Sequence, residues 1–129
     1  MKKLLLILTI FLSVSIYAQN LYFAAFKNIN KAKRLIKTNP QKADRLFIEA
    51  YSYLKQYVNE TIQNDKPSAN SFKLLGEMYL YGWGVDKDIN KAAKLLCAAK
   101  NLGNMQANSI IKKNNINCPE KINYKELKQ

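Results

Sequence analysis

The stretch from Ser71 to Ala107 constrains the fold of this chain more than any other part of its sequence. Apolar residues at helical spacing flank Gly82 and Gly84, which a single residue separates. Because glycine takes a positive φ without a steric penalty, this pair favours a tight reversal between two helices. The small and apolar residues on both sides recur at i, i+3, i+4 and i+7. The sequence therefore predicts a helical hairpin followed by the start of a third helix.

Single positions in this hairpin have separate structural roles. Gly76 lies on the apolar face of the first helix, where its missing side chain lets a neighbouring helix come close. Val85 is expected to fill the hairpin from the turn. Asp88 is an expected N-cap, since its carboxylate can accept hydrogen bonds from free amides of the next turn. Gly103 is expected to end the second helix, and Asn104 to cap the third.

The order and spacing of these residues resemble the Sel-one-like repeat, a helical-hairpin relative of the tetratricopeptide repeat. Counted from Ser71 to Ala107, the period is 36 residues, a length typical of repeat proteins. The second copy, which starts at Ala107, lacks the turn glycines and is expected to be a terminal cap. The positions that carry the resemblance are Leu75, Gly76, Tyr79, Gly82, Gly84, Val85, Asp88, Lys91, Ala92, Ala99, Gly103 and Ala107.

The predicted fold class is all-α, a short α/α superhelical solenoid of about five helices. No stretch alternates with period 2, so no sheet is expected. The expected helices span 21–37, 40–63, 69–81, 88–102 and about 104–114, followed by a short C-terminal helix with Ile122, Tyr124 and Leu127. The apolar stripe of the first helix contains Tyr22, Ala25, Phe26, Ile29, Ala32 and Ile36.

The chain divides into a signal peptide (1–18), a divergent helical hairpin (19–66), the Sel-one-like repeat with its capping helix (67–114) and a C-terminal tail (115–129). The divergent hairpin echoes the Lys-Ala spacing of the second one, 49 residues later at Lys91-Ala92. It is either a degenerate repeat or a pair of amphipathic helices that any bundle could contain.

The first 18 residues have the layout of a secretory signal peptide. Lys2 and Lys3 form a basic start, an apolar run covers 4–14, and Ala18 is a small residue at the expected cleavage site. The apolar run is shorter than the roughly 20 residues of a membrane span. We therefore expect a periplasmic or secreted protein with no membrane span after cleavage. An uncleaved N-terminal anchor is the alternative.

Export makes the two cysteines a candidate disulfide. A third helix that runs back along the second could return Cys118 towards Cys97. Two unpaired thiols are the alternative. The chain has no histidine, and two cysteines cannot complete a tetrahedral zinc site, so no metal is expected.

The chain is strongly basic, with 21 Lys and Arg against nine Asp and Glu. Without Lys2 and Lys3, 19 basic residues remain, for a net charge of about +10. Such a charge suits acidic partners, but export argues against nucleic acid. The lysines are scattered, so the charge indicates either a solvated basic surface or contact with anionic cell-wall material.

The sequence contains no recognisable catalytic set, so we expect neither an enzyme nor a cofactor. Without histidine, a Ser-His or Cys-His nucleophile pair is excluded. Gly82-x-Gly84 is a turn that follows no strand, which does not fit a nucleotide loop. Ser71-Phe72-Lys73 is one residue too short for the Ser-x-x-Lys motif of β-lactamases.

The resemblance implies a protein-binding surface on the first helix of each hairpin. Trp83 could anchor a partner or fold back over the hairpin end, and the tyrosines could bind a partner or fill space between repeats. The candidate binding residues are Lys73, Glu77, Leu80, Tyr81, Trp83, Tyr51 and Tyr53.

The function expected from the resemblance is that of an exported adaptor. It would bind another envelope protein of unknown identity, for example in a secretion or flagellar motor complex. The alternatives are binding of peptidoglycan, a β-lactamase-like secreted repeat protein, and an effector released from the cell.

Overall fold

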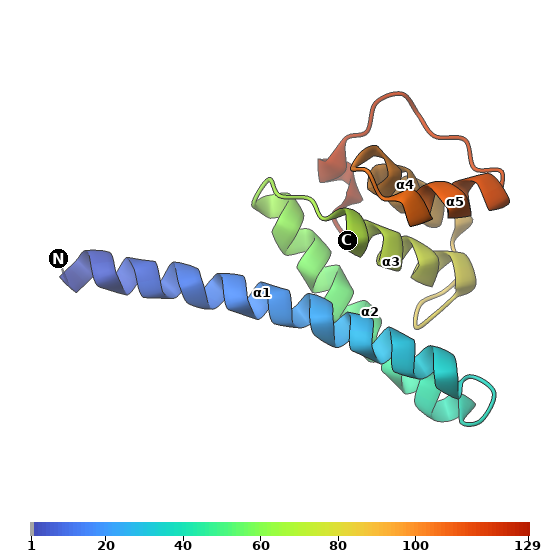
Figure 1. Ribbon diagram of the computed structural model, residues 1–129, viewed down its shortest axis with the longest axis horizontal. Coiled ribbons are helices and arrows are strands. Elements are labelled where there is room, and N and C mark those ends of the chain that lie inside the picture. Colours follow the sequence, from blue (N-terminus) through green and yellow to red (C-terminus); the bar gives the residue numbers. More distant parts are fainter. Residues whose placement is uncertain (1) are drawn as a thin grey trace.

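The computed structural model describes residues 2–129, without the side chains of residues 7–19. The predicted cleavage site after Ala18 and most of the apolar run before it lie outside the described side chains. Residues 2–129 form helices and no strand, which confirms the predicted all-α class (Figure 1). The elements are α1 (Lys2–Leu35), α2 (Pro40–Gln63), α3 (Ala69–Tyr81), α4 (Ile89–Asn101), α5 (Met105–Lys113) and the 3-10 helix η1 (Tyr124–Leu127).

Most predicted helix boundaries agree with the structure. The bounds of α2 and α3 are those expected, and α4 and α5 differ from the prediction by about one residue at each end. The first helix is different, because α1 begins at Lys2 and not at Leu21. Residues 2–35 contain neither glycine nor proline, so nothing in the sequence interrupts the helix there. Among the described residues, no helix is long and apolar enough to cross a membrane.

Each of α2 to α5 begins with a capping side chain, which satisfies an amide that the helix itself leaves free. Asn39 caps α2, and Ser68 caps α3. The two predicted caps are confirmed. Asp88 Oδ1 accepts from the Lys91 amide at 3.0 Å, and Asn104 Oδ1 accepts from the Ala107 amide at 2.9 Å.

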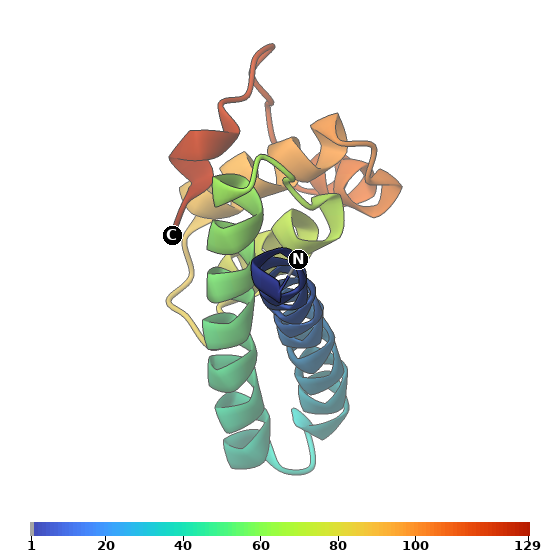
Figure 2. The same ribbon diagram turned by 90° about the vertical axis from the view of Figure 1, so that its left-hand side faces the viewer.

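The helices form two hairpins and one added helix that share a continuous core. α1 and α2 diverge from the turn that joins them, and α3, α4 and α5 cover one side of this pair (Figures 1 and 2). Fully buried alanines such as Ala25, Ala32, Ala43 and Ala50 let α1 and α2 approach closely. On α3, a Cβ built on Gly76 would lie 2.9 Å from Leu96 Cγ, so this glycine admits α4 as predicted.

The glycine turn between α3 and α4 also joins the two hairpins. Gly82 and Gly84 both have φ +70°, as the predicted reversal requires. A Cβ on Gly84 would lie 2.3 Å from the Phe47 carbonyl oxygen of α2. The ring of Trp83 stacks on Phe47 with 5.2 Å between centroids. Val85 packs against the core from the turn.

The predicted disulfide between Cys97 and Cys118 is present, with 5.6 Å between the two Cα atoms. It attaches the coil after α5 to α4. Beyond the disulfide, the chain passes over α4 and returns through η1 to the side of α2 (Figures 1 and 2). The short C-terminal helix expected from the sequence is this single 3-10 turn.

Candidate binding groove

A groove with a volume of about 300 Å³ lies between α1, α3 and α5. α1, α3 and α5 are the first helices of three successive helical units along the chain. We call this hollow the α1–α3–α5 groove. It is lined by Tyr22 and Phe26 of α1, by Asn70, Lys73 and Leu74 of α3, and by Gln106 of α5.

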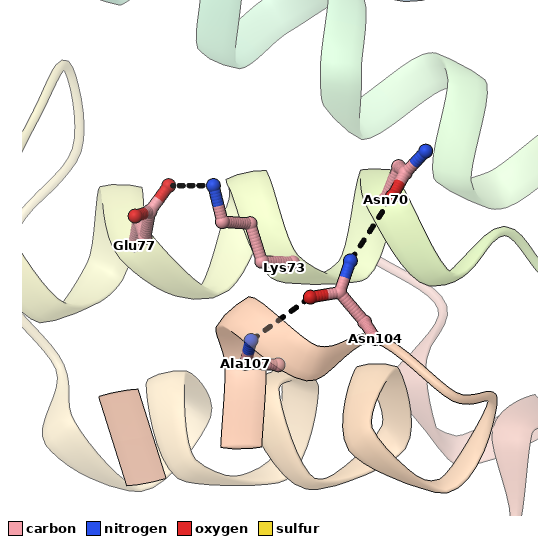
Figure 3. A network of polar contacts seen from close by, with 5 residues as sticks. All are labelled: Asn70, Lys73, Glu77, Asn104 and Ala107. Carbon is pink, nitrogen blue, oxygen red and sulfur yellow. Dashed lines mark hydrogen bonds and ion pairs between the residues drawn. The ribbon is translucent and has the colours of Figure 1, made fainter. Parts of the chain in front are cut away.

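The α3 wall carries an ion pair that is largely removed from solvent. Lys73 Nζ lies 3.1 Å from Glu77 Oε2, one helical turn along the same face of α3 (Figure 3). Glu77 is only 8% exposed, so its predicted outward position is wrong. Its Oε2 has no hydrogen-bond partner among the described residues, which leaves Lys73 as its counter-charge. Of the two residues, Lys73 lines the groove and Glu77 does not.

An amide contact sets the spacing between α3 and α5 at the groove. Asn104 Nδ2 donates to Asn70 Oδ1 at 3.0 Å, while Asn104 Oδ1 caps α5 (Figure 3). The side chain of Asn104 therefore uses both ends of its amide, one for each helix. The sequence predicted the cap but contained no local signal for the contact with Asn70.

The α1 wall is aromatic and partly open to solvent. Tyr22 and Phe26 stack with centroids 6.3 Å apart, and Tyr22 also contacts Tyr57 of α2 at 5.5 Å. Burial, with a contribution from Tyr57, raises the pKa of Tyr22. Phe26 is 44% exposed although it belongs to the predicted buried stripe, and Phe23 is 64% exposed. The sequence did not lead us to predict that these two rings are exposed, although Phe23 lies off the predicted apolar stripe.

Trp83 folds back over the hairpin end, which was one of the two alternatives for this residue. Its ring contacts the rings of Phe47 and Tyr81, and Lys33 Nζ of α1 lies 4.7 Å from the ring centroid. Tyr81 remains 47% exposed beside it. Leu80 is only 4% exposed, so its predicted outward position is also wrong.

Tyr51 and Tyr53 of α2 are half-buried and hydrogen-bonded. Tyr51 forms a 2.9 Å hydroxyl pair with Tyr79 of α3. Tyr53 donates to Glu49 at 2.6 Å on its own helix. The predicted binding residues therefore do not form one surface. Lys73 lies in the groove, Tyr81 and Trp83 lie at the hairpin end, and Tyr51 lies at a second hollow beside α4.

The groove combines apolar and polar side chains. An aromatic wall provides apolar contact area, while Asn70, Lys73 and Gln106 provide directional polar groups. Within the described residues, no cluster of His, Cys, Asp or Glu could hold a metal ion. Comparison with family models, curated proteins and solved structures gives no match to this chain. Its function is therefore inferred from its own residues.

Proposed function

We propose that this chain is an exported helical-repeat adaptor of the Sel-one-like type, and that it binds another protein of the cell envelope through the α1–α3–α5 groove. The observation that supports this most is that the first helices of successive helical units form the groove. Helical-repeat proteins use the surface formed by stacked repeats to hold their partners.

The residues of the groove suit a protein ligand. Aromatic side chains bury a large area on binding at a low cost in conformational entropy, and Phe26 with Tyr22 offers such an area. Lys73 is already held by Glu77, so less side-chain freedom is lost when it contacts a ligand. The expected partner segment has an apolar side chain for the α1 wall and a carboxylate or carbonyl group for Lys73.

Export is supported by the N-terminal pattern and by the disulfide. Structural disulfides form in oxidising compartments such as the periplasm or the extracellular space. All residues that line the groove follow Ala18, so signal cleavage at the proposed site leaves the groove complete. The proposed location is therefore the periplasm or the cell exterior.

Site-directed photo-crosslinking in intact cells tests this proposal. A photoreactive phenylalanine derivative is placed at Phe26 in the groove and, as a control, at Ile48, which is 58% exposed on α2. We expect one dominant envelope protein to be captured from Phe26 and not from Ile48. Lys73→Ala should weaken the capture from Phe26.

The proposal is contradicted if both positions capture the same proteins or neither captures any. Recovery of glycan fragments in place of a protein would instead support the binding of cell-wall material.

A further inference from the structure

A second hollow, of about 270 Å³, lies where α2, α3 and α4 meet the segment Tyr124–Gln129. None of its lining residues lines the α1–α3–α5 groove. Its walls include the hydroxyl-bearing rings of Tyr51 and Tyr79 and the buried side chain of Leu127. Its charged lining residues are Lys55, Lys91, Lys94, Lys128 and Glu126.

The segment that closes this hollow makes main-chain hydrogen bonds of the kind that a bound peptide makes. Asn59 of α2 donates through Nδ2 to the main-chain oxygen of Gln129 at 2.9 Å. The amide of Gln129 donates in turn to Asn59 Oδ1 at 2.6 Å. A side-chain amide that satisfies both main-chain groups of one residue recognises the backbone, whatever side chain that residue carries.

Side-chain contacts add selectivity at two positions of the segment. The Tyr79 hydroxyl donates to Gln129 Oε1 at 2.8 Å and is itself paired with the Tyr51 hydroxyl. Burial raises the pKa of Tyr79, so this hydroxyl remains a donor to a higher pH than that of a free tyrosine. Two residues earlier, Leu127 is 6% exposed and belongs to the core. Beside the hollow, the protein therefore holds an apolar residue and, two positions later, an acceptor side chain.

The charge of the segment does not match the charge of the hollow. The segment carries Lys125 and Lys128 against Glu126 and the main-chain carboxylate of Gln129, so it brings no excess of negative charge to the hollow. It lies beside Lys55, Lys91 and Lys94, and no ion pair within the described residues involves any of the lysines that line the hollow. An acidic segment would be attracted to these lysines more strongly than this one, which has no excess of negative charge.

We propose that this hollow is part of a peptide-binding site, that Leu127–Gln129 covers the rest of that site as an internal ligand, and that an acidic peptide of a partner protein displaces this segment. The peptide would place an apolar residue in the Leu127 position and Gln or Glu in the Gln129 position. The Cys97–Cys118 disulfide keeps the preceding coil on α4 when the segment leaves.

Fluorescence anisotropy with two labelled peptides tests the proposal on the full, disulfide-bonded chain. One peptide has the chain's own sequence from Tyr124 to Gln129, and the other carries Lys125→Glu and Lys128→Glu. We expect the acidic peptide to bind more tightly and to lose affinity as salt is raised. In the protein, Gln129→Ala removes one bond of the internal ligand and should tighten binding about fivefold.

The role of the lysines that line the hollow is tested with the double variant Lys55→Gln/Lys94→Gln, which should weaken binding of the acidic peptide about fivefold. Lys66→Gln/Lys112→Gln is the matched control, since both are exposed lysines outside the two hollows, and it should leave binding unchanged. The proposal is overturned if neither the wild type nor Gln129→Ala binds the acidic peptide. Equal binding of the two peptides, or an unchanged affinity in Lys55→Gln/Lys94→Gln, would also overturn it. Photo-crosslinking from Phe26 reports on the groove separately.

Discussion

The two helical hairpins of this protein are built by different means. α1 and α2 have 34 and 24 residues and are joined by a turn without glycine. α3 and α4 have 13 residues each and are joined through two glycines with positive φ. Long helices gain stability from an extended packed face, whereas short helices depend more on their ends. The second hairpin accordingly concentrates the turn glycines and the disulfide.

The two walls of the α1–α3–α5 groove also differ, because one belongs to each hairpin. α3 is buried on most sides, and Lys73 is held by its ion pair with the buried Glu77. α1 packs mainly on α2 and leaves Phe23 and Phe26 open to solvent. The groove thus combines a fixed polar wall with an exposed aromatic one. Substitutions in the two hairpins can show whether this contrast governs stability and binding.

The largest effect is expected from Gly84→Ala, which breaks the junction between the hairpins. The new Cβ would meet the Phe47 carbonyl at 2.3 Å on a residue with φ +70°. We expect a loss of about 4 kcal/mol from steric overlap and left-handed strain together. Urea unfolding measures it, and Trp83, the single tryptophan, reports on the junction by fluorescence.

Gly103→Ala is the matched control for this substitution. Gly103 has φ +92°, but nothing lies within 4 Å of its added Cβ. We expect only the strain cost of about 1–2 kcal/mol. Equal losses for the two variants would show that Gly84 contributes only through its φ and that the contact with Phe47 is unimportant.

The second-largest loss of stability is expected from removal of the disulfide, and it should affect only one region. Cys97→Ala/Cys118→Ala opens a loop with a sequence separation of 21 residues, for a loss of about 3 kcal/mol in the chain-entropy model. Hydrogen exchange should show lost protection in α5 and in residues 114–129 first. If α2 loses protection as early as α5, the two hairpins unfold as one unit and the contrast between them fails.

The features that could be predicted from the sequence are those with local signals. Asp88 and Asn104 were identified as caps because capping depends on a side chain and on amides within three residues. Gly82 and Gly84 were identified because only glycine takes their φ easily. The start of α2 could be predicted because Pro40 favours the first turn of a helix.

Features that depend on packing between distant segments could not be predicted. Helical periodicity gives the direction of an apolar face but not its width. α3 is covered on most sides by other helices, and this buries Leu80 and Glu77 beyond the expected stripe. Phe26 is exposed because α1 has fewer neighbours. No pattern along the chain indicates that Asn59 binds Gln129, 70 residues away.

A third prediction compares two pairs of side chains, each separated by one helical turn. Lys73→Ala leaves Glu77 of α3 buried without its counter-charge, and we expect a loss of about 2 kcal/mol. Gln56→Ala removes a similar contact to Glu60 on the exposed face of α2 and should cost less than about 0.5 kcal/mol. Urea unfolding gives both values.

The double variant Lys73→Leu/Glu77→Leu should recover most of the stability lost in Lys73→Ala, because no charge is then buried unpaired. If it is as unstable as the single variant, the loss comes from the packing of the lysine chain and not from the buried carboxylate.

A fourth comparison concerns the caps that begin α4 and α2. Asp88→Ala should cost about 1 kcal/mol, because a helix of 13 residues depends strongly on its first turn. Asn39→Ala should cost about half as much, since Pro40 already restrains φ at the first turn of α2. Both losses can be measured by thermal unfolding. Equal losses would mean that neither helix length nor the proline influences how much stability a capping side chain contributes.

The smallest effect is expected from alkaline pH, and it should arise mainly in the second hairpin. Burial raises the pKa of Tyr79 above its ordinary value of 10.0, with further contributions from the Tyr51 hydrogen bond and from the nearby Tyr51 and Asp88. Burial also raises the pKa of Tyr22, together with Tyr57.

A tyrosine whose pKa is higher in the folded than in the unfolded state contributes stability that is fully present below pH 10 and is lost as the pH rises above it. Measured between about pH 8 and pH 11, Tyr79→Phe should flatten this loss more than Tyr22→Phe does. Lysine titration is common to all three proteins and cancels in the differences. The same slope in wild type and Tyr79→Phe would show that the hydroxyl of Tyr79 ionises as freely in the folded chain as in the unfolded one.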